Sequence, residues 1–194
     1  MRHDTAGFTL LETAVALAVL LVMFAVAVPH VRAYSEHAYV EAAGRAFETE
    51  FRRAQSIAVR SQAQTALVFE ADDEPPTYAL YADRNHNGVR RADIGSGVDE
   101  RIAGPWALAA GLPGVRVAIL PGLRVIPPGT GPLATSDPIR FGNSDILSFG
   151  PLGTATPGTF YLAGRQLQAA VRVVAGTARV RLLVCRPGGT WREL

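Results

Sequence analysis

The residue with the clearest chemical significance is a glutamate inside an apolar segment. The segment runs for 21 residues, from Phe8 to Val28, and its polar residues are Thr9, Glu12 and Thr13. A carboxylate near the centre of a membrane-spanning helix costs about 2.5–3.5 kcal/mol on insertion scales, so such a residue is a candidate functional site. In a low-dielectric setting its natural partner is a paired ammonium group. We therefore predict that Glu12 has a cationic partner.

A second set of potential ligands lies in the sequence DRNHNG, residues 83–88. This sequence fits the opening of a calcium loop, D-x-[DN]-x-[DN]-G, in which oxygen ligands alternate and the glycine allows a sharp turn. Position twelve is Ile94 instead of a bidentate glutamate, which excludes an EF-hand. The alternative is a hairpin loop whose Asp and Asn side chains bond to their own backbone. The candidate ligands are Asp83, Asn85, Asn87 and, as a late ligand, Asp93 or Asp99.

Three arginines near the end of the chain form a candidate anion site. Residues 166–174 and 177–185 are predicted to form a hairpin that turns at Ala175-Gly176. This register places Arg172 opposite Arg179, with Arg181 on the same face, and directly opposed like charges favour an anion between them. Binding of DNA phosphates by this face would be salt-dependent and independent of base sequence. The alternative is a solvated strand face, because all 19 basic residues of this lysine-free chain are arginines.

The sequence contains no pattern typical of catalysis. A nucleophile elbow, a phosphate-binding glycine loop, paired metal histidines and a thiol–base pair are all missing from it. The single cysteine, Cys185, excludes an internal disulfide, and the formal net charge of +2 is too small to indicate a polyanionic partner for the whole chain. We expect neither an enzyme nor a required cofactor.

The elements that position these residues are one long helix followed by strands. The helix is predicted from residue 8 to the low 60s. The first part of this helix is the transmembrane segment 8–29, and its apolar run from Phe8 to Val28 is roughly 31 Å long, which matches a hydrocarbon core of about 30 Å. A cleaved secretory signal is the competing interpretation, because Arg2 and His3 precede the apolar run and Ala25-Val26-Ala27 is a small-x-small sequence. In the second part, a buried stripe is expected from the apolar residues that recur every three or four positions: Val40, Ala43, Phe47, Phe51, Ala54 and Ala58.

The remainder of the chain has the pattern of an antiparallel sheet. Alternation of apolar and polar residues predicts strands at 65–70, 77–83, 114–120, 123–126, 138–142 and 146–150, followed by the terminal hairpin. A helix followed by strands indicates an α+β fold in which an antiparallel sheet packs on the helix.

The sequence GFTLLE, residues 7–12, resembles the processing site of type IV prepilins and type II secretion pseudopilins. The resemblance implies cleavage between Gly7 and Phe8 by a prepilin peptidase and N-methylation of Phe8. It also implies that Glu12 neutralises the N-terminal amine of a neighbouring subunit, and that Pro29 kinks a continuous helix. The sequences SFGPLGTATPGTFYL and YADRNHNG, with the basic hairpin, are similar to the GspH/FimT family of minor pseudopilins.

The resemblance implies a pilin-like organisation: a leader at 1–7, a transmembrane and assembly helix at 8–29, an amphipathic continuation at 30–63 and a β-rich globular domain at 64–194. It implies a single-pass inner-membrane precursor with its globular domain outside the cytoplasm, which joins other pilin subunits in a type IV pilus or a type II secretion pseudopilus. Some similar minor pilins bind DNA through a Gly-Arg-x-Arg element, which corresponds here to Ala178-Arg179-Val180-Arg181. The remaining alternative is a membrane-anchored domain outside any filament, with or without bound calcium.

Overall fold

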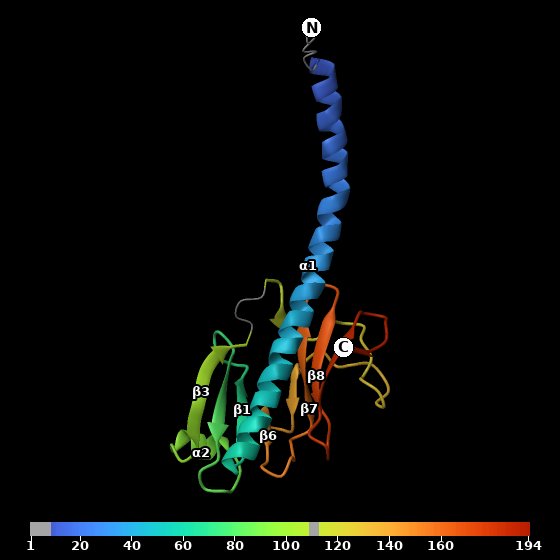
Figure 1. Ribbon diagram of the computed structural model, residues 1–194. Coiled ribbons are helices and arrows are strands. Elements are labelled where there is room, and N and C mark those ends of the chain that lie inside the picture. The colour runs from blue at the N-terminus through green and yellow to red at the C-terminus, as the bar shows by residue number, and fades with distance from the viewer. Residues whose placement is uncertain (1–8, 109–112) are drawn as a thin grey trace. The chain divides into compact units, whose positions relative to one another are not determined.

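The computed structural model describes residues 9–108 and 113–194, and for Val26 and residues 28–34 it describes the backbone alone. The chain divides into two compact units, Met1–Ser35 and Glu36–Leu194. Helix α1 (Leu10–Ser61) is followed by strands and one short helix (Figure 1). These elements are β1 (Thr65–Glu70), β2 (Thr77–Ala82), α2 (Arg91–Gly95), β3 (Glu100–Ala107), β4 (Arg116–Val117), β5 (Ile139–Phe141), β6 (Ile146–Phe149), β7 (Gly158–Ala163), β8 (Gln168–Val173), β9 (Val180–Cys185) and β10 (Arg192–Glu193).

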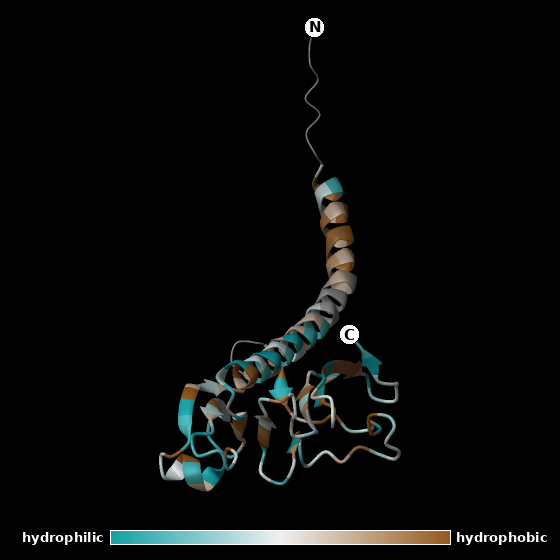
Figure 2. Cartoon of the chain, turned by 60° about the horizontal axis from the view of Figure 1, so that its bottom comes forward, coloured by the Kyte–Doolittle hydropathy of each residue, from teal (hydrophilic) through white to brown (hydrophobic). Residues whose placement is uncertain are grey.

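The first unit contains the apolar part of α1, and its described side chains face solvent. Leu10 is 89% exposed and Phe24 is 62% exposed, and Figure 2 shows the hydrophobic character of this stretch. Over the part of the chain that the structure describes, no helix is long and apolar enough to cross a membrane. The span expected at 8–29 begins at Phe8, which lies outside the described residues, and the helix continues through position 29.

The stripe predicted on the second part of α1 is buried, which confirms the helical periodicity. All of its members are at most 8% exposed: Val40, Ala43, Phe47, Phe51, Ala54 and Ala58. The ring of Phe47 lies 4.5 Å from that of Phe160 in β7, and the ring of Phe51 lies 5.8 Å from that of Phe141 in β5. Ion pairs form between residues four apart on the other faces of this part of the helix, with 2.7 Å between Glu48 and Arg52 and 4.0 Å between Glu41 and Arg45.

The strands form two antiparallel sheets in place of the single expected sheet. Among the described residues, one sheet has the order β3-β2-β1-β6 and the other has the order β10-β9-β8-β7-β4, with β5 also paired to β7. The two sheets separate because β5 pairs with β7 whereas β6 pairs with β1. The short connection between β5 and β6 includes Gly142 and Asp145, at φ values of 62° and 53°, and carries the chain from one sheet to the other.

The strands expected at 114–120 and 123–126 are largely wrong. In that region the structure has the two-residue strand β4 and an isolated bridge between Arg124 and Pro132. The segment instead packs on the face of the six-stranded sheet opposite α1, through Ile119, Leu120, Leu123, Ile126 and Leu133. This arrangement makes a second, smaller core without a regular ladder.

A buried glutamine supplies the hydrogen bonds that the missing ladder would have made. The side chain of Gln168, the first residue of β8, is fully buried. Its Nε2 donates to the carbonyl oxygens of Ala118 at 3.0 Å and Leu162 at 2.9 Å, and its Oε1 accepts from the Leu120 N–H at 2.8 Å. Because buried backbone groups need partners, this amide lets the segment pack on the sheet without forming a strand.

Among the described residues, the structure has three strands that the sequence did not predict: β3, β7 and β10. Strand β3 contains Gly104-Pro105 in its interior, a dipeptide that normally marks a turn, and the proline is tolerated because β3 is an edge strand. Strand β7 begins at a glycine that follows a proline, so its start has the pattern of a loop. At both positions, a glycine next to a proline therefore wrongly indicated a turn or loop where the structure has a strand.

The turn between β7 and β8 is attached to the first helical turn of the second unit. The carboxylate of Glu36 accepts the N–H groups of Arg165 and, at 3.0 Å, Gln166. A Cβ at Gly164 would lie 2.7 Å from Cγ2 of Val40, so the turn can approach α1 this closely because position 164 lacks a side chain. These contacts hold the six-stranded sheet to the helix at one end.

Substitution of Phe51 by alanine should strongly destabilise the second unit. The ring is fully buried among four other phenylalanines, so its loss leaves a cavity that costs about 3–5 kcal/mol. The matched control is Val59→Ala on the same helix, because Val59 is 44% exposed and its truncation should change stability by less than about 1 kcal/mol. Chemical unfolding of the full-length chain in detergent measures both, and equal losses would contradict the assigned core.

Substitution of Asp145 by asparagine should stabilise the protein near neutral pH. Burial, together with the nearby carboxylates of Asp137, Asp72 and Glu70, raises the pKa of Asp145 against the opposing effect of Arg91. A raised pKa in the folded state favours stability below the ordinary pKa of the carboxyl group, and this contribution is lost as the pH rises through the raised value. The charged form therefore destabilises the fold, and asparagine tolerates the left-handed φ at this position.

The expected result is a higher melting temperature for Asp145→Asn at about pH 7 and no gain at about pH 3, where the aspartate is already protonated. Asp73→Asn, in the exposed β1–β2 loop, is the control. A gain of the same size at both pH values would rule out the electrostatic cause.

Candidate functional site

The N-terminal motif is described from Thr9 onward, so Gly7 and Phe8 lie outside the described residues. Thr9 precedes the first turn of α1, and its hydroxyl accepts the N–H of Glu12 at 3.2 Å. This is an N-cap, and the Thr-x-x-Glu spacing is that of a capping box. The hydroxyl of Thr13 donates to the carbonyl oxygen of Leu10 at 2.9 Å. Both threonine hydroxyls are thus satisfied within the helix itself.

Glu12 differs from its polar neighbours because its carboxylate is exposed and, within the described part of the chain, forms no ion pair. Its negative charge lies in the first turn of α1, where the helix dipole favours it. The surrounding side chains are apolar and exposed. Among the described residues, the carboxylate is therefore left without a cationic partner.

The loop after β2 uses its acidic and amide oxygens to build a turn. The Asp83 carboxylate accepts the N–H groups of Asn85 at 3.1 Å and Gly88 at 2.8 Å, and Asn85 Oδ1 accepts the N–H of Asn87 at 3.3 Å. Asp99, which is 3% exposed, accepts the Arg90 N–H at 3.0 Å. This is the pattern of the structural alternative, in which side chains bond to their own backbone.

The proposed calcium ligands come only partly together in this loop. Asn85 Nδ2 lies 3.4 Å from Asp93 Oδ2, so the amide of Asn85 donates to the late ligand. Across the residues that the structure describes, no group of three or more His, Cys, Asp or Glu side chains is arranged to hold a metal ion. Calcium binding by Asp83, Asn85, Asn87 and Asp93 stays a prediction.

The terminal hairpin forms, but its predicted register is wrong. Arg172 is paired with Arg181 and not with Arg179, because the chain reverses over a wider loop in which the Val174 N–H donates to the Arg179 carbonyl at 3.0 Å. Ala178 adopts a left-handed φ of 49° in this loop. Since the slip is two residues, each side chain keeps its predicted face. Val171, Val173, Val180 and Leu182 are buried as expected.

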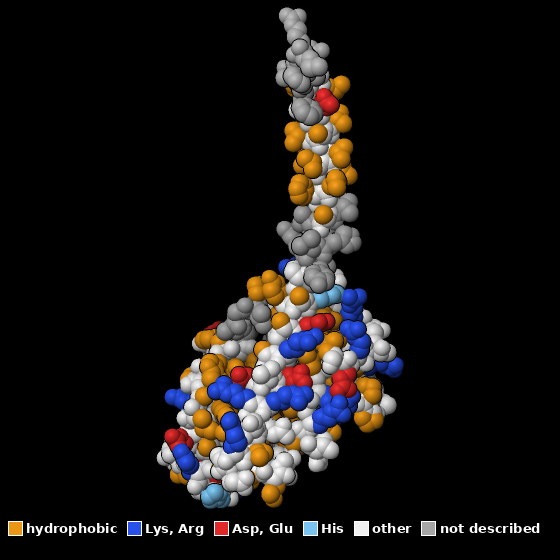
Figure 3. Space-filling view, viewed as in Figure 1, with side chains coloured by type: hydrophobic (Ala, Val, Ile, Leu, Met, Phe, Trp, Pro, Cys, Tyr) orange, Lys and Arg blue, Asp and Glu red, His pale blue; other side chains and the backbone are white. Residues whose placement is uncertain are grey.

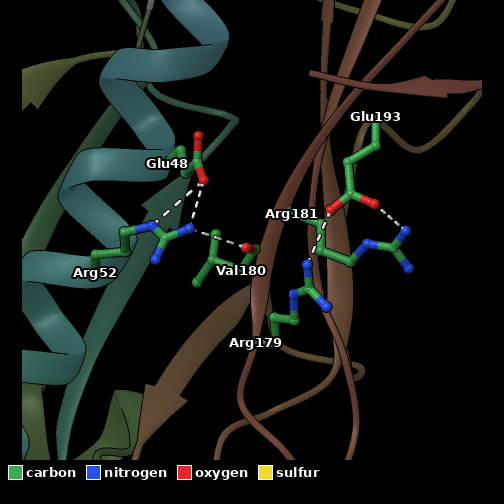
Figure 4. A network of polar contacts seen from close by, with 6 residues as sticks. All are labelled: Glu48, Arg52, Arg179, Val180, Arg181 and Glu193. Atoms are coloured by element: carbon green, nitrogen blue, oxygen red, sulfur yellow. Dashed lines mark hydrogen bonds and ion pairs between the residues drawn. The ribbon is translucent and has the colours of Figure 1, made fainter.

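A glutamate that was not predicted to belong to this site, Glu193, neutralises part of the positive charge of Arg179 and Arg181. Glu193 in β10 pairs with Arg179 at 3.4 Å and also with Arg181 (Figure 4). Hydrogen bonding to Glu193 raises the pKa of Arg181, and the same contact lowers the pKa of Glu193. Arg172 donates to the carbonyl oxygens of Ile126 at 3.4 Å and Pro127 at 3.3 Å. Only a prediction of β10 as a further strand beside the hairpin would have pointed to Glu193.

Charges of both signs are interspersed on the face drawn in Figure 3, where arginine and acidic side chains alternate over the helix and the strands. Helical pairs such as Glu48–Arg52 contribute to this mixture, and Arg52 also donates to the Val180 carbonyl at 3.4 Å (Figure 4). A mixed surface lacks the extended field of one sign that steers polyanions. Any anion site on this face is therefore local.

Comparison with protein-family models finds the prokaryotic N-terminal methylation motif at residues 2–28. Searches of curated proteins and of solved structures found no significant match to this chain. The matched segment contains Gly7, Phe8 and Glu12, the residues on which the sequence resemblance was based. It indicates a type IV prepilin-like protein.

Proposed function

We propose that the protein is a minor pilin-like subunit of the GspH/FimT type. It is processed between Gly7 and Phe8, N-methylated on Phe8, and assembled into a type II secretion pseudopilus or a type IV pilus. The observation that carries this proposal is the methylation motif at residues 2–28. The α+β globular unit, in which a helix packs on antiparallel sheets, is compatible with a pilin-like fold.

The apolar part of α1 needs a nonaqueous environment. Its side chains are exposed on all sides of the helix, with Leu11 at 76%, Leu21 at 69% and Val22 at 66%. A helix that is hydrophobic all round is stable in a membrane or among other apolar helices. In the proposed cycle, the inner membrane surrounds this segment in the precursor, and neighbouring subunits surround it in the filament.

Glu12 supplies the specificity of assembly in this proposal. Processing creates a new amine at Phe8, and Glu12 is then the fifth residue of the mature chain. An ammonium from the neighbouring subunit would neutralise the carboxylate, whereas an unpaired charge is expensive in apolar surroundings. The partners are accordingly a prepilin peptidase and other pilin subunits, and the globular unit lies outside the cytoplasm.

DNA binding is a second candidate function, and one observation favours it. Arg172 and Arg181 are direct cross-strand neighbours on the solvent-facing side of the β8–β9 hairpin, and phosphate oxygens are a natural counter-charge for such a pair. The pairing of Arg179 and Arg181 with Glu193 reduces the free positive charge. We therefore rank this function below filament assembly.

Replacement of Glu12 by glutamine or alanine should block assembly but leave processing and membrane insertion intact, because the carboxylate is needed only for the neighbouring amine. We expect wild type and both variants to yield mature protein beginning at methylated Phe8, measured by mass spectrometry of the N-terminal peptide. The sheared filament fraction should contain wild type and lack the variants. Glu41→Gln, which removes a partly buried acidic charge from the same helix, is the matched control.

A mature chain that begins near Val28 or Pro29 would instead establish a cleaved secretory signal. Normal recovery of both Glu12 variants in filaments would contradict the assigned role of the carboxylate.

The DNA alternative predicts that Arg179→Ala combined with Arg181→Ala weakens binding to a duplex in an electrophoretic shift assay. Two phosphate contacts should be lost, so the slope of log affinity against log salt should fall by about 2. The control pair is Arg84→Ala, in the loop after β2, with Arg101→Ala, in β3, which removes the same charge from a region away from the hairpin. Equal loss in both pairs, or no binding by wild type, counts against a DNA site at the hairpin.

A further inference from the structure

Three arginines lie together at the end of the second unit where its part of α1 begins. Arg165, in the turn between β7 and β8, donates its backbone N–H to the carboxylate of Glu36. Arg116 in β4 is paired with the last residue of β7, two positions before Arg165. Nη2 of Arg186, the residue after β9, lies 3.3 Å from Nδ1 of His37. We call Arg116, Arg165 and Arg186 the basic cluster.

The positive charge of the basic cluster is not neutralised by its surroundings. Its three side chains are exposed, and among the described residues none of them forms an ion pair. The carboxylate of Glu36 is used by two backbone N–H groups. His37 can accept the hydrogen bond of Arg186 only as a neutral imidazole, which brings no negative charge. Figure 3 shows basic side chains and a histidine at this end of the unit.

The sequence keeps this end of the unit near the apolar segment. Eight positions separate Val28, the last residue of the apolar run, from Glu36. This is about 12 Å of helix and at most about 29 Å of extended chain. The intervening residues include Arg32 and no acidic residue. When the apolar run occupies the hydrocarbon core, as proposed above, the basic cluster therefore lies close to the lipid headgroups.

An exposed tyrosine at the same end favours a lipid surface over a nucleic acid. Tyr39 follows Glu36 within one turn of α1 and is 38% exposed. Tyrosine is enriched at membrane–water interfaces, where its ring meets the acyl chains and its hydroxyl meets water. A nucleic acid would be attracted by the arginines alone, whereas a bilayer also accounts for the tyrosine and for the nearby apolar run.

We infer that the basic cluster binds the anionic headgroups of the bilayer in which the chain is anchored, and so holds the second unit against the membrane surface before assembly. The partner is a bilayer that contains phosphatidylglycerol. Attraction of this kind depends on the charge of the lipid and is screened by salt. The inference rests on the proposed membrane anchor, to which it adds an electrostatic contact made by the second unit.

The test measures how close this end of the unit lies to the headgroups of nanodiscs that carry the full-length chain. A fluorophore is attached at Gln166→Cys, an exposed position beside Arg165, while the buried native Cys185 stays unlabelled. A nitroxide on the lipid headgroup is the quencher, at the same fraction in discs of phosphatidylcholine and in discs that also contain phosphatidylglycerol. Quenching should be about twofold stronger with phosphatidylglycerol. The difference should vanish at about 1 M salt, where the Debye length is about 3 Å.

The combined substitutions Arg116→Gln, Arg165→Gln and Arg186→Gln should remove this difference at low salt, because the charges that attract the headgroups are lost. All three positions are exposed, so the fold should tolerate the changes. Quenching of this triple variant in phosphatidylglycerol discs should fall to the value in phosphatidylcholine discs.

The matched control is Arg60→Gln with Arg90→Gln and Arg101→Gln, which removes the same charge from other exposed positions. Arg60 lies in the last turn of α1, about 36 Å of helix beyond Glu36. This control should keep the full difference between the two kinds of disc.

Equal quenching of wild type in the two kinds of disc overturns the inference, as does a difference that survives in the triple variant or is lost in the control. These outcomes leave the membrane anchor intact, because they are measured on chains already inserted in a bilayer. Recovery of the chain free of lipid from both preparations would instead contradict the anchor, and the inference with it. The chain is used uncleaved, so the result is separate from that of the Glu12 variants.

Discussion

Burial of one apolar stripe of α1 against two sheets is the constraint on which the second unit depends. Phe51 contacts Phe69 of the four-stranded sheet and both Phe141 and Phe160 of the six-stranded sheet, so a single side chain joins all three layers. Figure 1 shows α1 lying across both sheets. Because aromatic rings at such distances interlock, the helix fixes where each sheet can lie. The two sheets can be separate because α1 packs on both of them and so holds them together.

This arrangement determines what must cover the outer faces of the two sheets. The inner faces are used by α1, so the outer apolar residues need other cover. Val89 and Ile94, from the loop and short helix after β2, pack on the four-stranded sheet, and the segment around Leu120 covers part of the six-stranded sheet. Gln168 makes the second cover possible because it satisfies the buried backbone of that segment. The uncovered part of the face carries Arg172 and Arg181, which line a groove there.

One helix therefore serves two different requirements. Its second part has apolar residues on one side and charged pairs on the other, which suits packing on the chain's own sheets. Its first part is apolar on every side and has no such core to cover it. The hydroxyls of Thr9 and Thr13 are hydrogen-bonded to the helix backbone, whereas the carboxylate of Glu12 forms no ion pair within the described part of the chain. The methylation motif coincides with this same segment.

The sequence by itself determined the elements that rest on local periodicity and short motifs. These are the long helix, its buried stripe, strands β1, β2, β5 and β6, the faces of the terminal hairpin and the prepilin-like motif. Periodicity records which side of an element is buried, and a two-residue slip preserves that side, so the faces were correct although the register was wrong. Only the tertiary structure decided the division into two sheets, the strandless cover held by Gln168, and the pairing of Glu193 with the arginines. Each of these joins residues whose neighbours in sequence give no sign of the contact, because it depends on which backbone groups and charges meet once the helix and sheets have packed.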